Sequence, residues 1–264
     1  MSNFKKWLET IRIGWSMVTA YRLNFFLLII GPALVFYFIK VSLWSAVYTD
    51  KDMLINGYSL PQMLHYHAWA LIVVLMAQSS NGVNLGEDIR FGRMSKYLIY
   101  PFNFWEFHTA SFISFQTIQF VIAIFTLALL CFSDLVSLPS FSNLMIAFAY
   151  TSLVGIFWFS VQYTTGLLAF WLEETWTMRV MFQLLVNFLS GSIIPISFFP
   201  AWAQNYLQYT PFPSLTYTPI NLFMGQMQGL HQGLITITIS IVAMFFINTY
   251  IWRRGLRLFT AAGM

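Results

Sequence analysis

Long apolar runs separated by short polar connections constrain the fold of this 264-residue chain more than any other feature. Six runs lie at about residues 23–43, 62–83, 108–131, 141–168, 176–194 and 233–252. Each comes close to the roughly 20 residues that a helix needs to cross the hydrocarbon core of a bilayer. Only 8% of the residues are charged, whereas soluble domains carry about 25%. The sequence therefore predicts an all-α integral membrane protein with six transmembrane helices.

The distribution of basic residues predicts the orientation of these helices. Only Lys40 and Lys51 fall on one side of the expected membrane. Eleven basic residues fall on the other side: Lys5, Lys6, Arg12, Arg22, Arg90, Arg93, Lys96, Arg179, Arg253, Arg254 and Arg257. Because cytoplasmic loops carry an excess of lysine and arginine, both termini and the loop at 84–107 are expected in the cytoplasm. The net charge of +4 is spread over these loops, which argues against a nucleic-acid partner.

Residues 1–22 form a predicted amphipathic helix ahead of the first span. Its apolar residues recur at helical spacing, namely Phe4, Trp7, Leu8, Ile11, Trp15 and Val18. Such a helix is expected in the inner headgroup layer, with its basic residues toward anionic lipid. Packing of its apolar face on a partner protein is the alternative.

The loop at 84–107 is a charged island between two apolar runs. It contains Glu87, Asp88, Arg90, Arg93, Lys96 and Glu106. Apolar and turn residues alternate with these charges: Ile89, Gly92, Met94, Tyr97, Leu98 and Pro101. The pattern predicts one short amphipathic helix, limited at its far end by the proline. We interpret this loop as a docking element for another subunit.

The segment from Val180 to Trp252 contains no aspartate, glutamate, lysine or arginine, yet it holds five of the nine prolines. It is too apolar for a solvated loop and too interrupted for a single span. Irregular backbone at membrane depth is stable only where protein or a water-filled cavity satisfies it. We therefore expect short re-entrant helices in the outer leaflet over residues 195–232, followed by the last span.

The chain offers few groups for chemistry of its own. A GxxxxGK[ST] phosphate-binding loop is absent from the sequence, and the single cysteine, Cys131, forms no intramolecular disulfide. His65 and His67 point in different directions on a helix, so interfacial histidines are expected there rather than a metal site. A membrane-embedded enzyme would need paired ionisable groups or a metal, and the four histidines lie at predicted span ends without obvious carboxylate partners. Energy for any transport must then come from another subunit.

Two stretches resemble the ABC-2 type transporter permeases. The loop GEDIRFGRMSKYLIYPFNFWEF is similar to the family's connection between its second and third helices, with Ile89, Gly92, Leu98 and Pro101 at matching positions. The late segment is similar to the family's stretch before its last helix, through Ser190-Gly191, Ile194-Pro195, Phe199-Pro200, Pro211-Phe212 and Gly225. With six spans and cytoplasmic ends, the resemblance covers nearly the whole chain and is closest to a bacterial branch of about this length.

The resemblance implies a permease in the bacterial cytoplasmic (inner) membrane that pairs with an identical or homologous permease. Two copies of a separate ATP-binding-cassette ATPase would hold ATP and magnesium, so this chain carries no cofactor. The docking residues implied are Glu87, Asp88, Ile89, Arg90, Gly92, Arg93, Met94, Tyr97, Leu98 and Pro101. The first, second and fifth spans would line the route. Candidate route or gate residues are Gln78, Asn81, Gln183, Asn187, Pro195, Phe198, Phe199 and Pro200.

Polar residues such as Gln78 and Asn187 serve equally well as hydrogen-bond partners of neighbouring helices. The aromatic, charge-free outer half favours export of an amphipathic or hydrophobic substrate. A non-transporting regulatory or assembly subunit of a membrane complex remains the alternative function. A docking loop alone does not establish that ATP hydrolysis in a partner drives movement of this chain.

Overall fold

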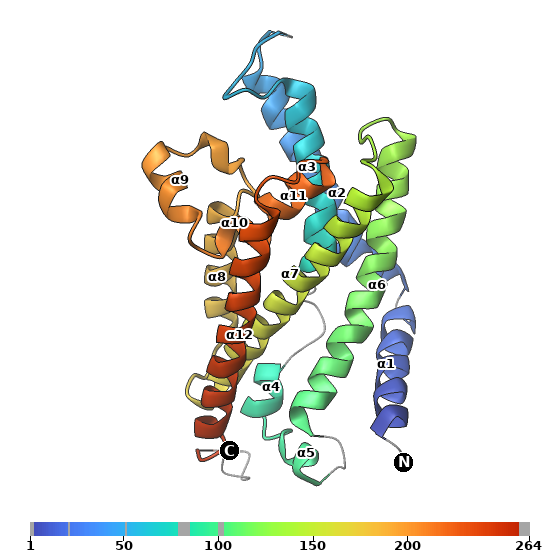
Figure 1. Ribbon diagram of the computed structural model, residues 1–264. Helices are drawn as coiled ribbons and strands as arrows, with labels where there is room; N and C mark the ends of the chain where they lie inside the picture. Colours follow the sequence, from blue (N-terminus) through green and yellow to red (C-terminus); the bar gives the residue numbers. More distant parts are fainter. Residues whose placement is uncertain (1–2, 21, 51, 79–84, 100–102, 259–264) are drawn as a thin grey trace.

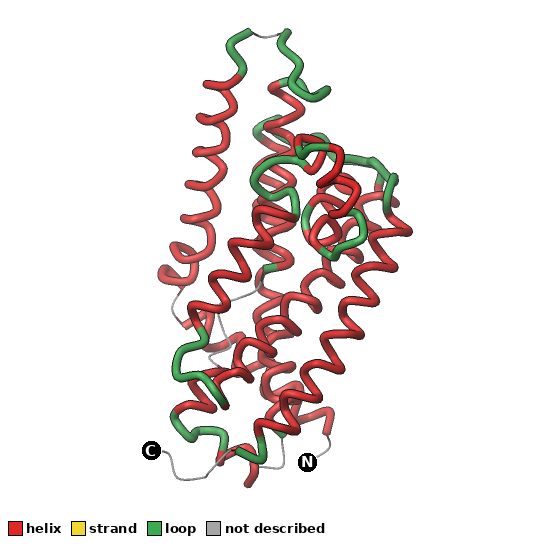
Figure 2. Tube along the Cα trace, turned by 90° about the vertical axis from the view of Figure 1, so that its left-hand side faces the viewer, coloured by secondary structure: helices red, strands yellow, loops and turns green. Residues whose placement is uncertain are grey.

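The computed structural model describes residues 3–20, 22–50, 52–78, 85–99 and 103–258, and these residues are mainly helical (Figures 1 and 2). Helix α1 spans Asn3–Ala20, α2 spans Arg22–Val47 and α3 spans Leu60–Ala77. In the described part of the chain, pairing of β type is limited to one isolated bridge between Ile55 and Tyr58. The predicted all-α class is therefore confirmed.

Four helices are long and apolar enough to cross a membrane, counted over the residues that the structure describes. They are α3, α6 (Phe104–Phe132), α7 (Phe141–Leu167, extended to Phe170 by the 3-10 turn η1) and α12 (Leu230–Gly255). Helix α2 covers the first predicted span with 26 residues. The structure thus supports a multi-pass membrane protein with four candidate spans.

The fifth predicted span, at residues 176–194, is shorter than expected. Helix α8 runs only from Trp176 to Leu189, 14 residues, which correspond to about 21 Å at 1.5 Å per residue. The chain turns at Gly191, whose φ of +86° lies in the left-handed region that a glycine enters without steric cost. Helix α8 therefore falls short of the roughly 30 Å hydrocarbon core of a bilayer.

Helix α7 lies at the centre of the bundle, and α3, α11 and α12 pack around it (Figure 1). Helix α6 contacts α7 through the stacked rings of Phe112 and Phe159, whose centroids are 4.5 Å apart. Its Ala147 and Thr151 are fully buried. One turn further on, a Cβ atom at Gly155 would lie 3.4 Å from the side chain of Gln116 on α6. Small residues at these positions permit close packing of α7 on its neighbours.

The outer surface of the bundle is apolar. Large hydrophobic side chains point away from the protein on several helices: Val121, Ile124, Phe125 and Leu129 on α6, Met181, Leu184 and Leu185 on α8, and Ile235, Ile239, Val242, Phe245 and Phe246 on α12. Contiguous apolar surface of this extent is rare on soluble monomers. It fits contact with lipid or with another membrane subunit.

Helix α1 packs along the lower half of α6 (Figure 1). The hydroxyl of Ser114 on α6 donates a hydrogen bond to the backbone carbonyl of Ile11, at 3.1 Å. A Cβ atom at Gly14 would overlap that hydroxyl oxygen, so glycine permits the close approach. One side of α1 thus contacts the chain's own bundle, and its location in the headgroup layer stays a prediction.

The predicted segment at 195–232 consists of short helices between turns. These are η2 (Ile196–Phe198), α9 (Ala201–Leu207), α10 (Phe212–Leu215) and α11 (Tyr217–Phe223). Pro195, Pro200 and Pro211 each stand directly before one of them, where the fixed φ of proline suits the start of a helix. The segment lies at the end of the bundle opposite to α4 and α5 (Figure 1).

Candidate functional site

The charged island folds as two short helices, α4 (Leu85–Arg90) and α5 (Ser95–Ile99), joined by a turn. We call Leu85–Ile99 the α4–α5 element. The single amphipathic helix predicted for this loop is wrong, because Gly92 adopts a φ of +66° and reverses the chain. The backbone N–H of Met94 then donates to the carbonyl of Asp88, at 2.8 Å, which closes the turn.

One face of the α4–α5 element is anchored on the rest of the chain. Leu85, Ile89, Met94 and Tyr97 join a buried cluster that also contains Phe104, Phe112, Phe159, Tyr163 and Leu167. The fit against α7 is close, since a Cβ atom at Gly166 would lie 2.5 Å from the side chain of Leu85. Movement of α4 would therefore be passed directly to α7 and α6.

Asp88 faces this interior rather than solvent. The hydroxyl of Tyr97 donates to its Oδ2 atom at 3.0 Å. Arg93, Lys96 and His108 each place a nitrogen 3.8 Å from the carboxylate. Burial, with the nearby Asp88 charge, raises the pKa of Tyr97, so that Tyr97 remains a protonated donor at neutral pH. Asp88, predicted as a docking contact, is placed where it connects the two short helices to each other and lies beside His108 of α6.

The other face of the element carries the exposed charges. Arg93 pairs with Glu87 at 3.3 Å, and Arg90 pairs with Glu174, in the connection before α8, at 3.6 Å. Of the remaining predicted docking residues, the side chain of Leu98 and all of Pro101 lie outside the described residues.

Phe91 stands at the tip of this exposed face. Its side chain is 55% exposed, and the guanidinium carbons of Arg90 and Arg93 lie 5.3 and 5.1 Å from its ring centroid. These distances fit cation–π contacts. The element therefore presents an aromatic ring between two cations, a combination that is enriched at protein interfaces.

Three predicted route residues meet between α3 and α8. Gln183 donates from Nε2 to the Oε1 atom of Gln78 at 2.6 Å, and Gln78 donates from Nε2 to the Oδ1 atom of Asn187 at 3.4 Å. Asn81 lies outside the described residues. The cluster is uncharged and joins the second predicted span to the fifth.

The predicted gate residues are divided between two surroundings. Phe198 has its ring centroid 5.9 Å from those of both Trp44 and Tyr58. Phe199 contacts Phe188 of α8, with ring centroids 5.7 Å apart. Pro195 and Pro200 occupy the cap positions of η2 and α9. The structure therefore places Phe198 against α2 and Phe199 against α8.

Two ionisable side chains are buried near the outer end of α2. Lys40 is 5% exposed. His67 on α3, expected at the interface, is 3% exposed and accepts a hydrogen bond on Nε2 from the Trp44 indole, at 2.7 Å. The ring of His67 thus packs into the aromatic cluster around Trp44, and its depth relative to the membrane interface stays a prediction.

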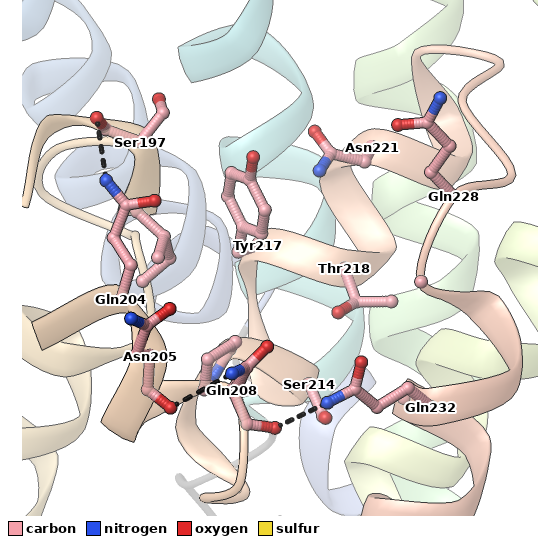
Figure 3. Close-up of a pocket in the computed structure, with 14 residues that line it drawn as sticks. Ser197, Gln204, Asn205, Gln208, Ser214, Tyr217, Thr218, Asn221, Gln228 and Gln232 are labelled. Carbon is pink, nitrogen blue, oxygen red and sulfur yellow. Dashed lines mark hydrogen bonds between the residues drawn. The ribbon is translucent and has the colours of Figure 1, made fainter. Parts of the chain in front are cut away.

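A polar cavity of about 280 Å³ lies between α9, α11 and the start of α12 (Figure 3). It is lined by Ile196, Ser197, Gln204, Asn205, Gln208, Pro213, Ser214, Tyr217, Thr218, Asn221, Gln228, Gly229, Gln232 and Gly233. Amide and hydroxyl groups dominate this lining, and none of these side chains carries a formal charge. We call it the outer cavity.

The comparisons with known proteins decide the family. A family model described as ABC-2 family transporter protein matches residues 21–263. This chain belongs to the ABC-2 transporter family. None of the curated proteins compared with the sequence matches it. The predicted family resemblance is confirmed over nearly the whole length of the chain.

Membership in this family gives the α4–α5 element a context. ABC-2 permeases are membrane subunits that are not themselves catalytic and that normally work with ABC ATPases. In this ABC-2 protein, α1 begins and α12 ends at the same end of the bundle as α4 and α5 (Figure 1). This arrangement fits the common side that the basic residues predict.

The sequence reasoning missed several residues of these sites in the ABC-2 protein. Phe91 was overlooked because it interrupts a charged face, although an apolar residue among arginines is itself a signal of contact. The amides of the outer cavity were overlooked because each one alone resembles a helix-packing residue. Seven amides within residues 204–232 of an uncharged segment form the pattern that points to a shared polar site.

Proposed function

We propose that this chain is the permease subunit of an ABC exporter, powered by a separate ATPase that docks on the α4–α5 element. The observation that carries the proposal is the two-sided construction of this element. One face is locked into the bundle through Leu85 and Tyr97. The opposite face exposes Phe91 between two arginines. A partner that moves this element moves the helices on which it packs.

The packing around the element extends to the last span. Phe104, at the start of α6, stacks on Trp252 of α12 with ring centroids 5.1 Å apart. A Cβ atom at Gly255 would overlap the ring of Phe170, so the end of α12 fits tightly on η1. Because densely packed interiors transmit displacement, force on α4 would reach α6, α7 and α12 together.

The substrate route runs between α2, α3 and α8 in this proposal. Gln78, Gln183 and Asn187 supply hydrogen-bonding groups without charge. Such a surface suits an amphipathic or hydrophobic substrate, because burying an unpaired charge costs far more than burying a hydrogen-bonded amide. Two copies of the ATPase and a second permease, identical or homologous, would complete the transporter in the inner membrane.

Purification of the tagged protein in mild detergent, expressed from its native locus, tests the proposal. Mass spectrometry is expected to find an ABC ATPase in stoichiometric amount. It would also show whether a second permease accompanies the chain. Recovery of the intact chain without an ATPase would contradict the proposal and favour a regulatory or assembly subunit.

Substitution of Phe91 by alanine tests the docking surface itself. We expect Phe91→Ala to lower the amount of ATPase that purifies with the permease, since exposed aromatic residues flanked by arginine often dominate binding. Leu138→Ala is the matched control, because Leu138 is also 55% exposed but lies in the connection between α6 and α7 at the opposite end. Equal ATPase recovery with both variants would exclude Phe91 from the interface.

A further inference from the structure

The outer cavity contains a buried amide without a partner in the protein. Asn221 on α11 is 7% exposed, and its side chain points into the cavity (Figure 3). Within the described residues, its side-chain amide makes no hydrogen bond, although its backbone carbonyl accepts from the N–H of Gln226 at 2.8 Å. The amide of Asn221 is therefore available to a bound molecule.

Three glutamines turn acceptor atoms toward the same space. The Nε2 atom of Gln204 donates to the carbonyls of Ser197 and Phe199, at 3.3 and 2.7 Å. Gln208 donates to the carbonyl of Asn205 at 3.1 Å, and Gln232 donates to that of Gln208 at 2.9 Å. Only the NH₂ end of an amide can donate to a carbonyl. These contacts therefore fix the opposite ends of the three amides as oxygens, free to accept from a ligand (Figure 3).

The lining indicates the chemistry of that ligand. A phosphate would call for arginine or lysine, and a divalent cation would call for carboxylates, and neither residue type is among the side chains of the cavity. Hydroxyl groups both donate and accept hydrogen bonds. They can donate to the three glutamine oxygens and satisfy both ends of the Asn221 amide.

We propose that the outer cavity binds a neutral polyhydroxyl group, such as a sugar or polyol. Its volume of about 280 Å³ stands near the lower end of small-molecule sites, which hold roughly 300–1,000 Å³. The inference goes beyond the proposed function, because it concerns binding and holds whether or not the bound molecule is transported. Two sources supply this chemistry, namely the headgroup of a neutral glycolipid and a free saccharide.

The neighbouring helix α9 favours a glycolipid as the source of the bound group, because its exposed aromatic residues suit the membrane–water interface. Trp202 and Tyr206 on α9 are 68% and 73% exposed, while Gln204 and Asn205 of the same helix line the cavity. Tryptophan and tyrosine are enriched where protein meets the membrane–water interface. A glycolipid with its headgroup in the cavity would then have its acyl chains at the level of these rings.

Binding to the purified full-length chain in phosphatidylcholine nanodiscs tests the proposal. The probes are glucosyl-diacylglycerol in the disc, detected as retained lipid by native mass spectrometry, and maltose in solution, followed by calorimetry. Phosphatidylglycerol serves as the anionic competitor. We expect the wild-type chain to retain glucosyl-diacylglycerol, to bind maltose, or both, and to prefer each over phosphatidylglycerol. Binding of the lipid alone would identify the headgroup as the source, and binding of maltose would identify a free saccharide.

Asn221→Leu removes the unpaired amide while keeping a similar size. Because no protein hydrogen bond is lost, the thermal midpoint should stay at the wild-type value, whereas affinity for the bound probe should fall about tenfold or more. Asn143→Leu, the same substitution on α7 outside the cavity lining, should leave binding unchanged. If Asn221→Leu does not fold, Gln232→Leu at an exposed position serves in its place. Equal binding by wild type and the cavity variant, no binding of either probe, or equal binding of phosphatidylglycerol would overturn the proposal.

Discussion

The ammonium group of Lys40 donates a hydrogen bond to the backbone carbonyl of Ile193, at 2.7 Å, across 153 residues of sequence. Lys40 lies on α2, and Ile193 follows the turn at Gly191 that ends α8. The same ammonium lies 5.2 Å from the ring centroid of Phe36. One buried cation thus connects α2 to the turn that follows α8, and both helices belong to the route that we propose for the substrate.

Replacing Lys40 by methionine should loosen this connection without unfolding the protein. Methionine keeps a long apolar side chain, so packing is largely retained. The substitution also removes the cost of burying the charge, several kcal/mol, which offsets the lost hydrogen bond of about 1.5–3 kcal/mol. We therefore expect an almost unchanged thermal midpoint and faster hydrogen exchange over residues 190–194.

The exposed Lys96 provides the control for this change. Lys96→Met on α5 should leave exchange over residues 190–194 as in the wild type. Unaltered exchange in Lys40→Met would show that the contact with Ile193 does not restrain the turn.

Removing the hydroxyl of Tyr97 should weaken the α4–α5 element. Tyr97→Phe deletes the hydrogen bond to the buried carboxylate of Asp88, and bonds to charged groups contribute about 1.5–3 kcal/mol. We expect the free energy of unfolding to fall by about that amount, measured by chemical denaturation in detergent. Tyr206→Phe, at a position 73% exposed, should change it by less than about 0.5 kcal/mol. Equal effects of the two substitutions would mean that the Asp88 contact adds no stability.

Substitutions of Gly92 should differ in stability and in ATPase binding according to how well the new residue adopts the positive φ of this turn. At a φ of +66°, an ordinary L-residue loses roughly 1–2 kcal/mol, whereas asparagine is several-fold enriched there. Gly92→Asn should therefore retain more ATPase binding and a higher thermal midpoint than Gly92→Val. The reverse order would show that the space beside Gly92, rather than its φ, limits the side chain.

Much of the fold could be predicted because each long apolar run in the sequence predicts a membrane helix at the same place. The expected span at 141–168 corresponds to α7 at Phe141–Leu167, and the expected span at 108–131 lies within α6. The short helices after Pro195 could be predicted as well, since prolines mark helix starts. The early end of α8 could not, because Gly191 looks like any small residue of a membrane helix until its positive φ is seen.

The candidate sites were less predictable because they depend on contacts between distant residues. Spacing placed Asp88 on the docking face, but its partners Tyr97 and His108 lie inside, so the carboxylate turns inward. The pairing of Gln78 with Gln183 joins side chains 105 residues apart. No local pattern distinguishes such a pair from two separate helix-packing amides.

The bond between Gln78 and Gln183 makes a prediction of its own, because it joins α3 to α8 within the assigned route. Hydrogen bonds between helices in membranes contribute about 0.6 kcal/mol on average and at most about 1.7 kcal/mol. A double-mutant cycle with Gln78→Leu and Gln183→Leu should therefore give a coupling energy of about 0.5–1.7 kcal/mol in unfolding experiments. A cycle of Gln183→Leu with Gln119→Leu on α6 should be additive, because no hydrogen bond between these two is recorded in the described part of the chain. Additivity in the first cycle as well would mean that the two amides act independently, and α3 and α8 would then be free to separate as substrate passes.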